Sequence, residues 1–276
     1  MAAGSIASLS ADVRPLRDFP LQARRKVCFV LCDIDDTLTD GGRLTARAYE
    51  ALERLHAAGL KIVPVTGRPA GWCDLIARFW PVDAVVGENG ALYFAYDRDM
   101  RRMTRCYWKT EGQRRKDRER LALIEAQILA QVPGAAVAAD QAFREADLAI
   151  DYREDVAPLA NDAIARIVAI FEAAGAQARV SSIHVNGWFG DYDKLAMSRG
   201  LLKERFGVDQ DRAPEQVLFV GDSPNDAPMF AHFSHTVGVA NVRDFAGVLA
   251  VEPAWVTEAR GGAGFAELAA ALLEAR

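Results

Sequence analysis

Three aspartates fall within four positions of this sequence, directly after an apolar run. The stretch CFVLCDIDDTLTD (28–40) places Asp33, Asp35 and Asp36 at the end of a strand that looks fully buried. Like charges at this spacing repel one another, and a buried charge without a partner is costly. The pattern therefore indicates a site at which something must neutralise the carboxylates.

Polar side chains follow other predicted core elements as well. Ligands of open parallel sheets bind beyond the carboxyl ends of the strands. Four such places carry suitable residues: Asp33, Asp35 and Thr37; Thr66 and Gly67; Lys194; and Asp222 with Asp226. A divalent cation held by Asp33, Asp222 and Asp226 would neutralise their charge, and hard oxygen ligands are those that Mg²⁺ prefers.

Alternating strand and helix patterns predict how these residues are positioned. VCFVLC (27–32) is apolar on both faces, as in a central parallel strand. The elements predicted after it are a helix over 44–58, a strand over 60–65, a helix over 71–80 and a third strand over 83–90. This alternation implies a parallel sheet with right-handed crossovers.

The pattern changes near residue 91. A hairpin (91–110), a charged helix (111–132), a strand (146–153), a helix (157–175) and a further strand (176–185) are predicted in turn. We interpret residues 92–185 as an α+β module inserted into the first domain. The α/β pattern resumes with a helix over 192–206, strands over 216–221 and 236–240, a helix over 226–232, a short strand near Trp255 and a last helix from about Gly264. Residues 1–25 are predicted to form a poorly ordered tail.

The composition restricts the partners and the compartment. The 276 residues carry a net charge of −5, which argues against nucleic acid and anionic membranes as partners. No apolar run reaches the ~18 residues needed to span a bilayer, and the N-terminus lacks the features of a signal peptide. The four cysteines form no CxxC pair. Cys28 and Cys32 fall on one face of a strand and are interpreted as buried reduced thiols, so we expect a reducing, cytoplasmic location.

Four motifs in order resemble those of the haloacid-dehalogenase superfamily of phosphohydrolases. DIDDTLTD matches its first motif, VTGRP (65–69) its second, Lys194 in DYDKLAM its third and GDSPND (221–226) its fourth. The resemblance covers residues 26–91 and 186–270. An insert between the second and third motifs is similar to a C2-type cap, and GENGA before it resembles the Cof-type and sugar-phosphate phosphatases and phosphomannomutases. The resemblance thus implies a doubly wound parallel sheet (26–91 and 186–276) with an α+β C2-type cap (92–185).

The resemblance also implies roles for the motif residues. Asp33 would attack phosphorus, and Asp35 would act as general acid and base, its main-chain carbonyl rather than its carboxylate binding Mg²⁺. Thr66, Gly67 and Lys194 would grip the phosphoryl oxygens, helped by free amides of the loop around Ile34 and Asp36.

Several of these residues have alternative interpretations. Lys194 could be a structural partner of Asp33. Asn225 either orients Asp222, contacts phosphate or caps a turn. Arg68 either pairs with an anionic substrate or caps a helix, and Asp36 fits a turn better than a catalytic role.

The substrate is expected between the core and the insert, where a closing cap excludes water. The insert offers Arg144, Glu145 and Arg153 as substrate contacts. Its return to the core offers Asn186, Trp188 and His184, although a lone strand histidine is also typical of a core.

These observations favour a Mg²⁺-dependent phosphatase that hydrolyses a phosphomonoester of a small metabolite, with a sugar phosphate as the expected substrate, and that acts as a monomer or homodimer. A phosphotransferase or phosphomutase on the same fold is the alternative. A signalling receiver domain would have neither GDSPND nor the insert, and a catalytically inactive member would not need the full set of motif residues. An ion pump with the same aspartyl-phosphate chemistry would need membrane segments.

Overall fold

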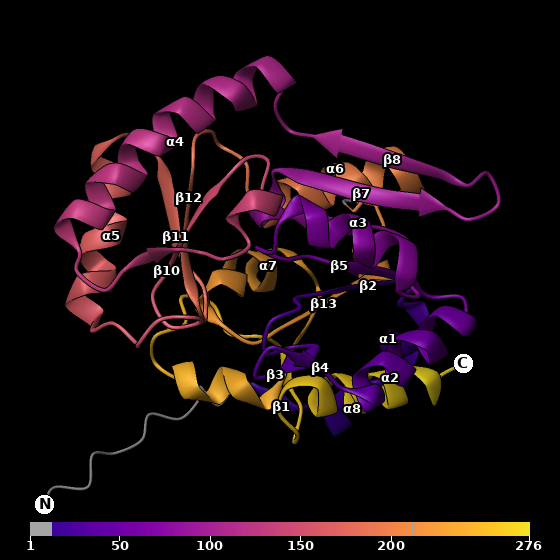
Figure 1. The fold of residues 1–276 in the computed structure, drawn as a ribbon. Coiled ribbons are helices and arrows are strands. Elements are labelled where there is room, and N and C mark those ends of the chain that lie inside the picture. The colour runs from indigo at the N-terminus through magenta and orange to yellow at the C-terminus, as the bar shows by residue number, and fades with distance from the viewer. Residues whose placement is uncertain (1–12, 211) are drawn as a thin grey trace, which may run out of the picture. The chain divides into compact units, whose positions relative to one another are not determined.

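The computed structural model describes residues 13–210 and 212–276 and divides into two compact units (Figure 1). The first unit contains the described residues up to Val65, Trp80–Ala84 and Leu201–Arg276, and the second contains Thr66–Phe79 and Val85–Gly200. Helix α6 (Lys194–Phe206) begins in the second unit and ends in the first. The segment predicted as the cap, 92–185, lies wholly within the second unit, together with residues 66–79 and 85–91.

Six parallel strands form the sheet of the first unit, in the order β1-β15-β14-β13-β2-β5. They are β1 (Arg14–Pro15), β2 (Phe29–Cys32), β5 (Lys61–Pro64), β13 (Val217–Gly221), β14 (His235–Gly238) and β15 (Trp255–Val256). Strands β2, β13 and β14 are buried at every position, as central parallel strands must be. Cys32 lies opposite both Val220 and Pro64, so β2, β13 and β5 end at one edge of the sheet. The predicted parallel α/β sheet is confirmed.

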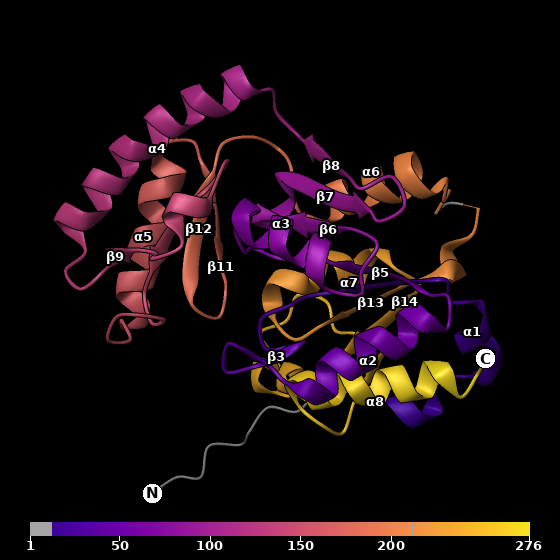
Figure 2. The ribbon, with the colours of Figure 1, turned by 45° about the vertical axis from the view of Figure 1, so that its right-hand side comes forward.

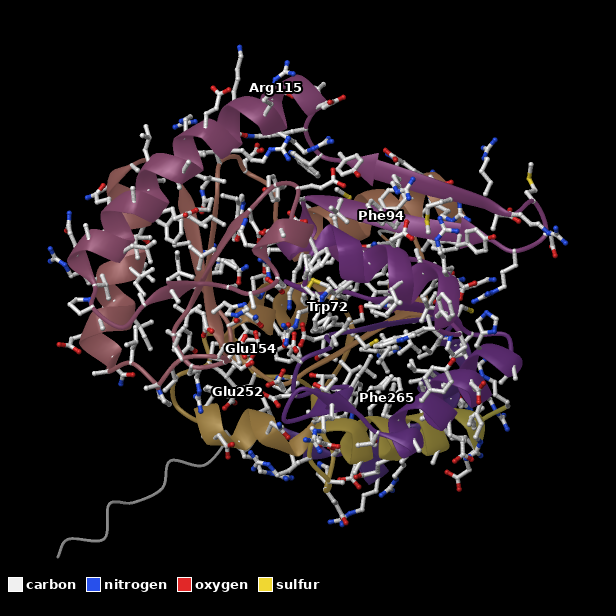
Figure 3. All side chains as sticks on the ribbon, in the orientation of Figure 1. Trp72, Phe94, Arg115, Glu154, Glu252 and Phe265 are labelled. Atoms are coloured by element: carbon white, nitrogen blue, oxygen red, sulfur yellow. The ribbon has the colours of Figure 1, made fainter. Side chains whose placement is uncertain are left out.

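Helices cover the sheet of the first unit: α1 (Leu21–Lys26), α2 (Ala46–Ala57), α7 (Ala227–His232) and α8 (Gly261–Leu273). Thr45 caps α2 by accepting the Ala48 N–H at 3.3 Å. Helices α2 and α8 lie side by side (Figures 1 and 2), and Phe265 of α8, labelled in Figure 3, is fully buried. A two-stranded hairpin, β3 (Thr39–Asp40) and β4 (Arg43–Leu44), precedes α2.

The N-terminal segment differs from the sequence-based expectation. Residues 1–12 of the predicted tail lie outside the described residues. Residues 14–26 form β1, a 3-10 helix and α1, and Leu16 and Phe19 are buried. The Phe19 ring stacks on Trp255 of β15 at 4.0 Å between centroids. Burial of these apolar side chains explains why this part of the predicted tail is packed rather than poorly ordered.

Two antiparallel sheets form the second unit. One has the order β6-β7-β8, with β6 (Val85–Gly87), β7 (Leu92–Asp97) and β8 (Arg102–Tyr107). The other has the order β11-β12-β10-β9, with β9 (Ala136–Val137), β10 (Leu148–Asp151), β11 (Gln177–Val180) and β12 (His184–Trp188).

Two strand predictions in this unit were wrong. The predicted third parallel strand is β6, which pairs with β7 because the chain reverses at Glu88–Gly90 through left-handed backbone. The single strand predicted over 176–185 is two strands, because a tight turn separates them. In that turn the Ser181 N–H donates to the His184 carbonyl at 2.8 Å.

Helices α3 (Ala70–Phe79), α4 (Glu111–Gln131) and α5 (Asn161–Ala173) complete the second unit. Figures 1 and 2 show α4 and α5 on one face of the four-stranded sheet, where Ile128, Phe171 and Val185 share one core. Short 3-10 helices lie at Leu16–Asp18, Pro214–Gln216, Pro224–Asp226 and Ala240–Phe245 in the first unit, and at Glu88–Gly90 and Gln141–Phe143 in the second.

All four cysteines are free. Cys32 and Cys73 are buried, and burial raises the pKa of both thiols. Cys28 is exposed because β2 begins only at Phe29, so its predicted burial was wrong. Within the described part of the chain, no helix combines the length and the apolar character that crossing a membrane requires.

Gly187 tests the packing of the second unit. A Cβ at this position in β12 would collide with the Phe171 ring of α5. We expect Gly187→Ala to lower the free energy of unfolding by about 1–3 kcal/mol, because overpacking forces the ring from its place. Thermal unfolding would measure the loss, and Phe171→Leu should recover part of it. Gly112→Ala, in the open first turn of α4, is the control and should not destabilise the protein.

Candidate active site

Three carboxylates converge at the carboxyl edge of the parallel sheet. Asp33, Asp222 and Asp226 each offer an oxygen, and these atoms all lie within 4.8 Å of one another. The three residues are 6%, 3% and 0% exposed. The structure therefore brings together the three side chains that the sequence predicted as cation ligands.

The strand order explains this convergence. Asp33 directly follows β2 and Asp222 directly follows β13, the neighbouring parallel strand, and the Asp33 N–H donates to the Val220 carbonyl at 3.0 Å. One Asp226 oxygen accepts the N–H of Asp222 at 3.0 Å and that of Ser223 at 3.4 Å. A Cβ on Gly221 would collide with the same carboxylate, so the close approach needs glycine there.

The electrostatics of the group favour a cation. Burial raises the pKa of Asp222 well above its usual range, and the carboxylates of Asp33 and Asp226 raise it further. A 3.0 Å hydrogen bond from the Thr37 hydroxyl acts in the opposite direction. Three hard oxygen donors whose negative charges disfavour one another fit Mg²⁺.

The loop after Asp33 is a compact turn. The Ile34 carbonyl accepts the N–H groups of Thr37, Leu38 and Thr39 at 2.9–3.3 Å. Asp35 is half-buried. Asp36 has a left-handed backbone (φ 59°), which agrees with a turn residue.

The amide of Asp36 is not free. It donates to the Thr39 hydroxyl at 3.0 Å, while Asn241 donates to the Asp36 carbonyl at 3.1 Å. The expectation that this amide contributes to a phosphate grip was therefore wrong, because the turn already uses it.

Residues 66–69 of the second motif belong to the second unit, and Val65 belongs to the first. Thr66 is fully buried; its N–H donates to Val86 at 2.9 Å and its hydroxyl accepts the Arg68 N–H at 3.0 Å. That hydroxyl keeps its own hydrogen for another acceptor. Lys194, the first residue of α6, is buried in the same unit.

The Arg68 side chain contacts an aromatic ring and an acidic side chain of the protein. Its guanidinium is 4.5 Å from the Trp72 ring centroid and pairs with Glu154 at 2.9 Å; both partners are labelled in Figure 3. His184 Nε2 lies 2.9 Å from the other Glu154 oxygen. His184 and then Arg68 lower the pKa of Glu154 to about 2. Binding of substrate by Arg68 stays a prediction.

Three further residues were predicted to contact the substrate, and the structure gives each of them a hydrogen bond within the protein. Asn186 is buried on β12 and donates to Asp147 at 3.0 Å. Arg153 is exposed, and its N–H donates to Asp151 at 2.8 Å. Asn225 lies in the 3-10 turn before α7, where it accepts the Ser223 hydroxyl at 2.9 Å, as a turn residue would. Direct contact of Asn186, Arg153 and Asn225 with substrate stays a prediction.

Two other candidates are already held by protein partners. Arg144 is buried in ion pairs with Asp140 and Asp147. Glu145 accepts the Tyr107 hydroxyl at 3.0 Å and lies 3.4 Å from Arg114.

Sequence reasoning missed the buried acid Glu88. Its carboxylate accepts four backbone N–H groups, from Ala70, Glu145, Ala146 and Asp147, at 2.6–3.2 Å. Burial, followed by the charge of Asp147, raises the pKa of Glu88 to about 7, and Arg144 opposes this rise. The signal lay in GENGA, whose Asn-Gly pair marks a turn directly after a charged residue.

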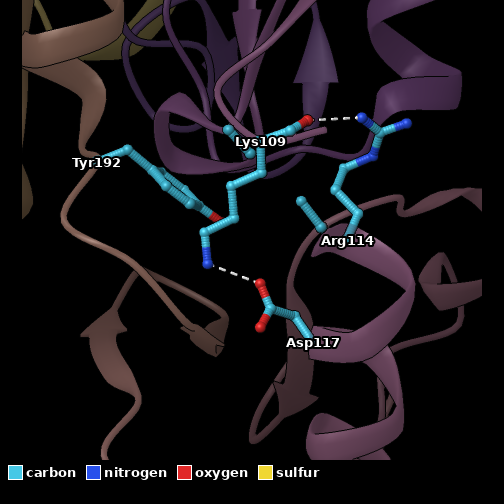
Figure 4. Close-up of a pocket in the computed structure, with 6 residues that line it drawn as sticks. Lys109, Arg114, Asp117 and Tyr192 are labelled. Atoms are coloured by element: carbon cyan, nitrogen blue, oxygen red, sulfur yellow. Dashed lines mark hydrogen bonds and ion pairs between the residues drawn. The ribbon is translucent and has the colours of Figure 1, made fainter. Parts of the chain in front are cut away.

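A small pocket in the second unit is lined by Lys109, Arg114, Asp117 and Tyr192, with Ala91 and Ala146 (Figure 4). Lys109 pairs with Asp117 at 2.7 Å and Arg114 with Glu145 at 3.4 Å. Both cations of this pocket therefore have carboxylate partners within the second unit.

Comparisons with known proteins identify the family and the fold. A family model for haloacid dehalogenase-like hydrolases matches residues 29–233. A search of curated proteins found no match. The fold is similar to that of Thermoplasma acidophilum protein 0175, with 19% identity over 91% of this chain and 99% of that one and a TM-score of 0.68.

Two further structures share the fold. A HAD/COF-like hydrolase from Plasmodium vivax is 16% identical over 93% of this chain and 100% of its own, with a TM-score of 0.65. A sucrose-phosphatase from Synechocystis sp. PCC6803, solved with sucrose and phosphate, is 15% identical over 90% and 98%, with a TM-score of 0.61.

Mg²⁺ should stabilise the wild-type protein, because a cation relieves the repulsion among its buried carboxylates. We expect Asp222→Asn to raise the unfolding temperature of the metal-free protein and to weaken the response to Mg²⁺. Thermal unfolding with EDTA or Mg²⁺ would measure both effects. Asp18→Asn, at an exposed site of the same unit, should alter neither. A wild-type protein insensitive to Mg²⁺ would contradict the cation site.

Glu88 should make stability depend on pH. Its folded pKa of about 7 lies above the ordinary value, so its contribution is full below about pH 4 and is lost as the pH rises through 7. We expect the unfolding temperature to fall between about pH 5 and 8, and Glu88→Gln to flatten that slope. Glu119→Gln, on the exposed face of α4, should leave the slope unchanged. An equal slope in Glu88→Gln would contradict the assignment.

Proposed function

We propose that this chain, which belongs to the haloacid dehalogenase-like hydrolase family, is a Mg²⁺-dependent phosphatase of a phosphorylated small metabolite. The observation that carries the proposal is the buried group of Asp33, Asp222 and Asp226 at the ends of β2 and β13. Such a group would hold a cation beside Asp33, the carboxylate that directly follows β2. Phosphoryl transfer needs mainly this positioning and charge neutralisation.

Asp33 and Asp35 divide the chemistry in the proposed mechanism. An Asp33 oxygen attacks phosphorus, and the bond from phosphorus to the substrate oxygen breaks as an aspartyl-phosphate forms. Asp35 gives its proton to the departing oxygen and then takes one from a water that attacks the intermediate. Inorganic phosphate leaves and both carboxyl groups return to their first state. Bound Mg²⁺, held by Asp33, Asp222, Asp226 and the Asp35 carbonyl, would neutralise charge throughout.

In the proposed mechanism Thr66, Gly67 and Lys194 bind the phosphoryl oxygens. This assignment rests on the second and third motifs and on the remaining hydroxyl hydrogen of Thr66. Asn186 and Arg153 remain the candidates for contacts to the leaving group.

A sugar phosphate is the first substrate class to test. The Synechocystis enzyme of the same fold is a sucrose-phosphatase, and this supports the choice without naming the sugar. The four free cysteines fit a reducing compartment, so the proposal includes a cytoplasmic location. A phosphotransferase or phosphomutase is the second candidate, because the same Asp33 chemistry serves it when a hydroxyl replaces water.

Asp33→Asn tests the nucleophile. We expect it to lower phosphate release by at least about 1,000-fold, because an amide cannot form the acyl phosphate. Release would be measured on a panel of sugar phosphates, phosphoglycerates, nucleotides and p-nitrophenyl phosphate, with Mg²⁺ or EDTA. Asp36→Asn makes the same chemical change in the same loop, and asparagine tolerates its left-handed backbone. This control should stay within about threefold of wild type.

The outcomes separate the candidates. Appreciable turnover by Asp33→Asn would end the nucleophile assignment. Phosphate released in Mg²⁺ and not in EDTA supports the hydrolase. A long-lived phosphoenzyme that reacts only when an acceptor sugar is added supports the transferase.

A further inference from the structure

Arg144 makes more contacts than a buried ion pair requires. Its side chain is 1% exposed. Nε and Nη2 donate to both oxygens of Asp140 at 2.9 and 3.1 Å, and Nη1 donates to Asp147 at 2.9 Å. The same Nη1 also donates to the main-chain carbonyl of Gly67 at 2.9 Å. The guanidinium therefore joins the segment 140–147 to the backbone of the second motif.

The carbonyl of Gly67 and the N–H of Arg68 belong to one planar peptide group. A hydrogen bond that fixes the carbonyl therefore fixes the direction of the N–H. That N–H donates to the Thr66 hydroxyl at 3.0 Å. By holding this plane, Arg144 determines which lone pair of the Thr66 hydroxyl accepts the Arg68 N–H. The direction in which the hydroxyl can donate its own hydrogen follows from that.

Asn89 acts in the same way on the preceding peptide. Its N–H donates to the Thr66 carbonyl at 3.1 Å, and this carbonyl shares a plane with the Gly67 N–H. The Thr66 carbonyl and the Gly67 N–H point in opposite directions across the trans peptide. The hydrogen bond to the carbonyl therefore also fixes the direction of the Gly67 N–H. The Asn89 side chain donates to Asp147 at 3.3 Å. Asp147 is thereby the common partner of Asn89 and Arg144.

We propose that Arg144 and Asn89, joined by Asp147, are positioning residues that orient the Thr66 hydroxyl and the Gly67 N–H toward a phosphoryl group. This inference rests on the proposed function, which assigns those two donors to the phosphoryl oxygens. It differs from the sequence-based expectation for Arg144, which made it a contact to the leaving group. Glu88 supports the arrangement, since its carboxylate holds the N–H groups of residues 145–147 beside the first residue of α3.

The two roles for Arg144 predict different kinetics. A contact to the leaving group matters only for a substrate that has that group. A residue that orients the phosphoryl donors matters equally for every phosphomonoester. Misplacement of such donors also affects kcat more than KM, because their alignment counts most in the transition state.

The experiment compares Arg144→Lys and Asp147→Asn with wild type, with the preferred sugar phosphate and with p-nitrophenyl phosphate. Lysine keeps the charge and loses the fork that reaches four acceptor oxygens. The asparagine of Asp147→Asn keeps the shape of the side chain. It places an N–H₂ group, which cannot accept a hydrogen bond, opposite the amide donors of Asn89 and Asn186. We expect kcat to fall about 100-fold on both substrates, with KM changed less than about threefold.

Asp117→Asn is the matched control, since it disrupts the Lys109 ion pair of the same unit without touching residues 66–68 (Figure 4). Hydrogen exchange of the segment 66–70 provides a readout that needs no activity. It should quicken about 10-fold in Arg144→Lys and Asp147→Asn and stay at the wild-type rate in Asp117→Asn.

The outcomes test the role of Arg144 separately from the proposed phosphatase activity. If wild type releases no phosphate, the proposed function fails, and hydrogen exchange still decides whether Arg144 holds the loop. Unchanged exchange at 66–70 overturns the inference. A loss confined to the sugar phosphate overturns it in favour of a leaving-group contact, and an equal loss in Asp117→Asn overturns it in favour of a purely structural role.

Discussion

The repulsion among three buried carboxylates is the constraint on which the first unit depends. Asp33 and Asp222 meet because β2 and β13 are neighbouring parallel strands in register at Cys32 and Val220. The fold tolerates the group because backbone N–H groups and the Thr37 hydroxyl donate to it, and these donors leave oxygens directed at one small space. Glycine at 221 is a consequence of the same constraint, since any side chain there would displace Asp226.

The second unit surrounds its buried carboxylates with hydrogen-bond donors. Asp140 and Asp147 both pair with Arg144, and Glu88 is held by four backbone N–H groups. These carboxylates are therefore held by a guanidinium and by backbone N–H groups of the second unit, whereas the first unit gathers the carboxylates of Asp33, Asp222 and Asp226 within 4.8 Å of one another. A buried ion pair contributes little net stability and instead imposes geometry, because each partner is costly if left alone. That is the property required of groups that set the direction of a peptide plane.

The sequence predicted the first unit better than the second for a physical reason. Its central parallel strands are buried on both faces, so VCFVLC and VLFVG are continuous apolar runs, and the candidate site residues follow each strand directly. The polar network of the second unit links Glu88, Arg144 and Asn186 through Asp147, although these residues are far apart in the chain. No periodicity relates them, so only the folded backbone reveals the network. The pairing of β6 with β7 was missed for a similar reason, because it depends on the backbone angles of Glu88 and Asn89.

Left-handed backbone at residues other than glycine is concentrated where chemistry is assigned. Four such residues occur in the described chain, and three of them, Asp36, Glu88 and Asn89, lie in the two loops discussed above. Each costs of order 1 kcal/mol and persists only where its surroundings hold it. Asn241 and Thr39 hold the Asp36 turn, and hydrogen bonds to segment 145–147 hold Glu88. In both loops the strained residue sits beside a group that must point in one direction, the Asp33 carboxylate in one case and the Thr66–Gly67 peptide in the other. Strain at these positions is thus the expected consequence of fixing functional groups through the main chain rather than through flexible side chains.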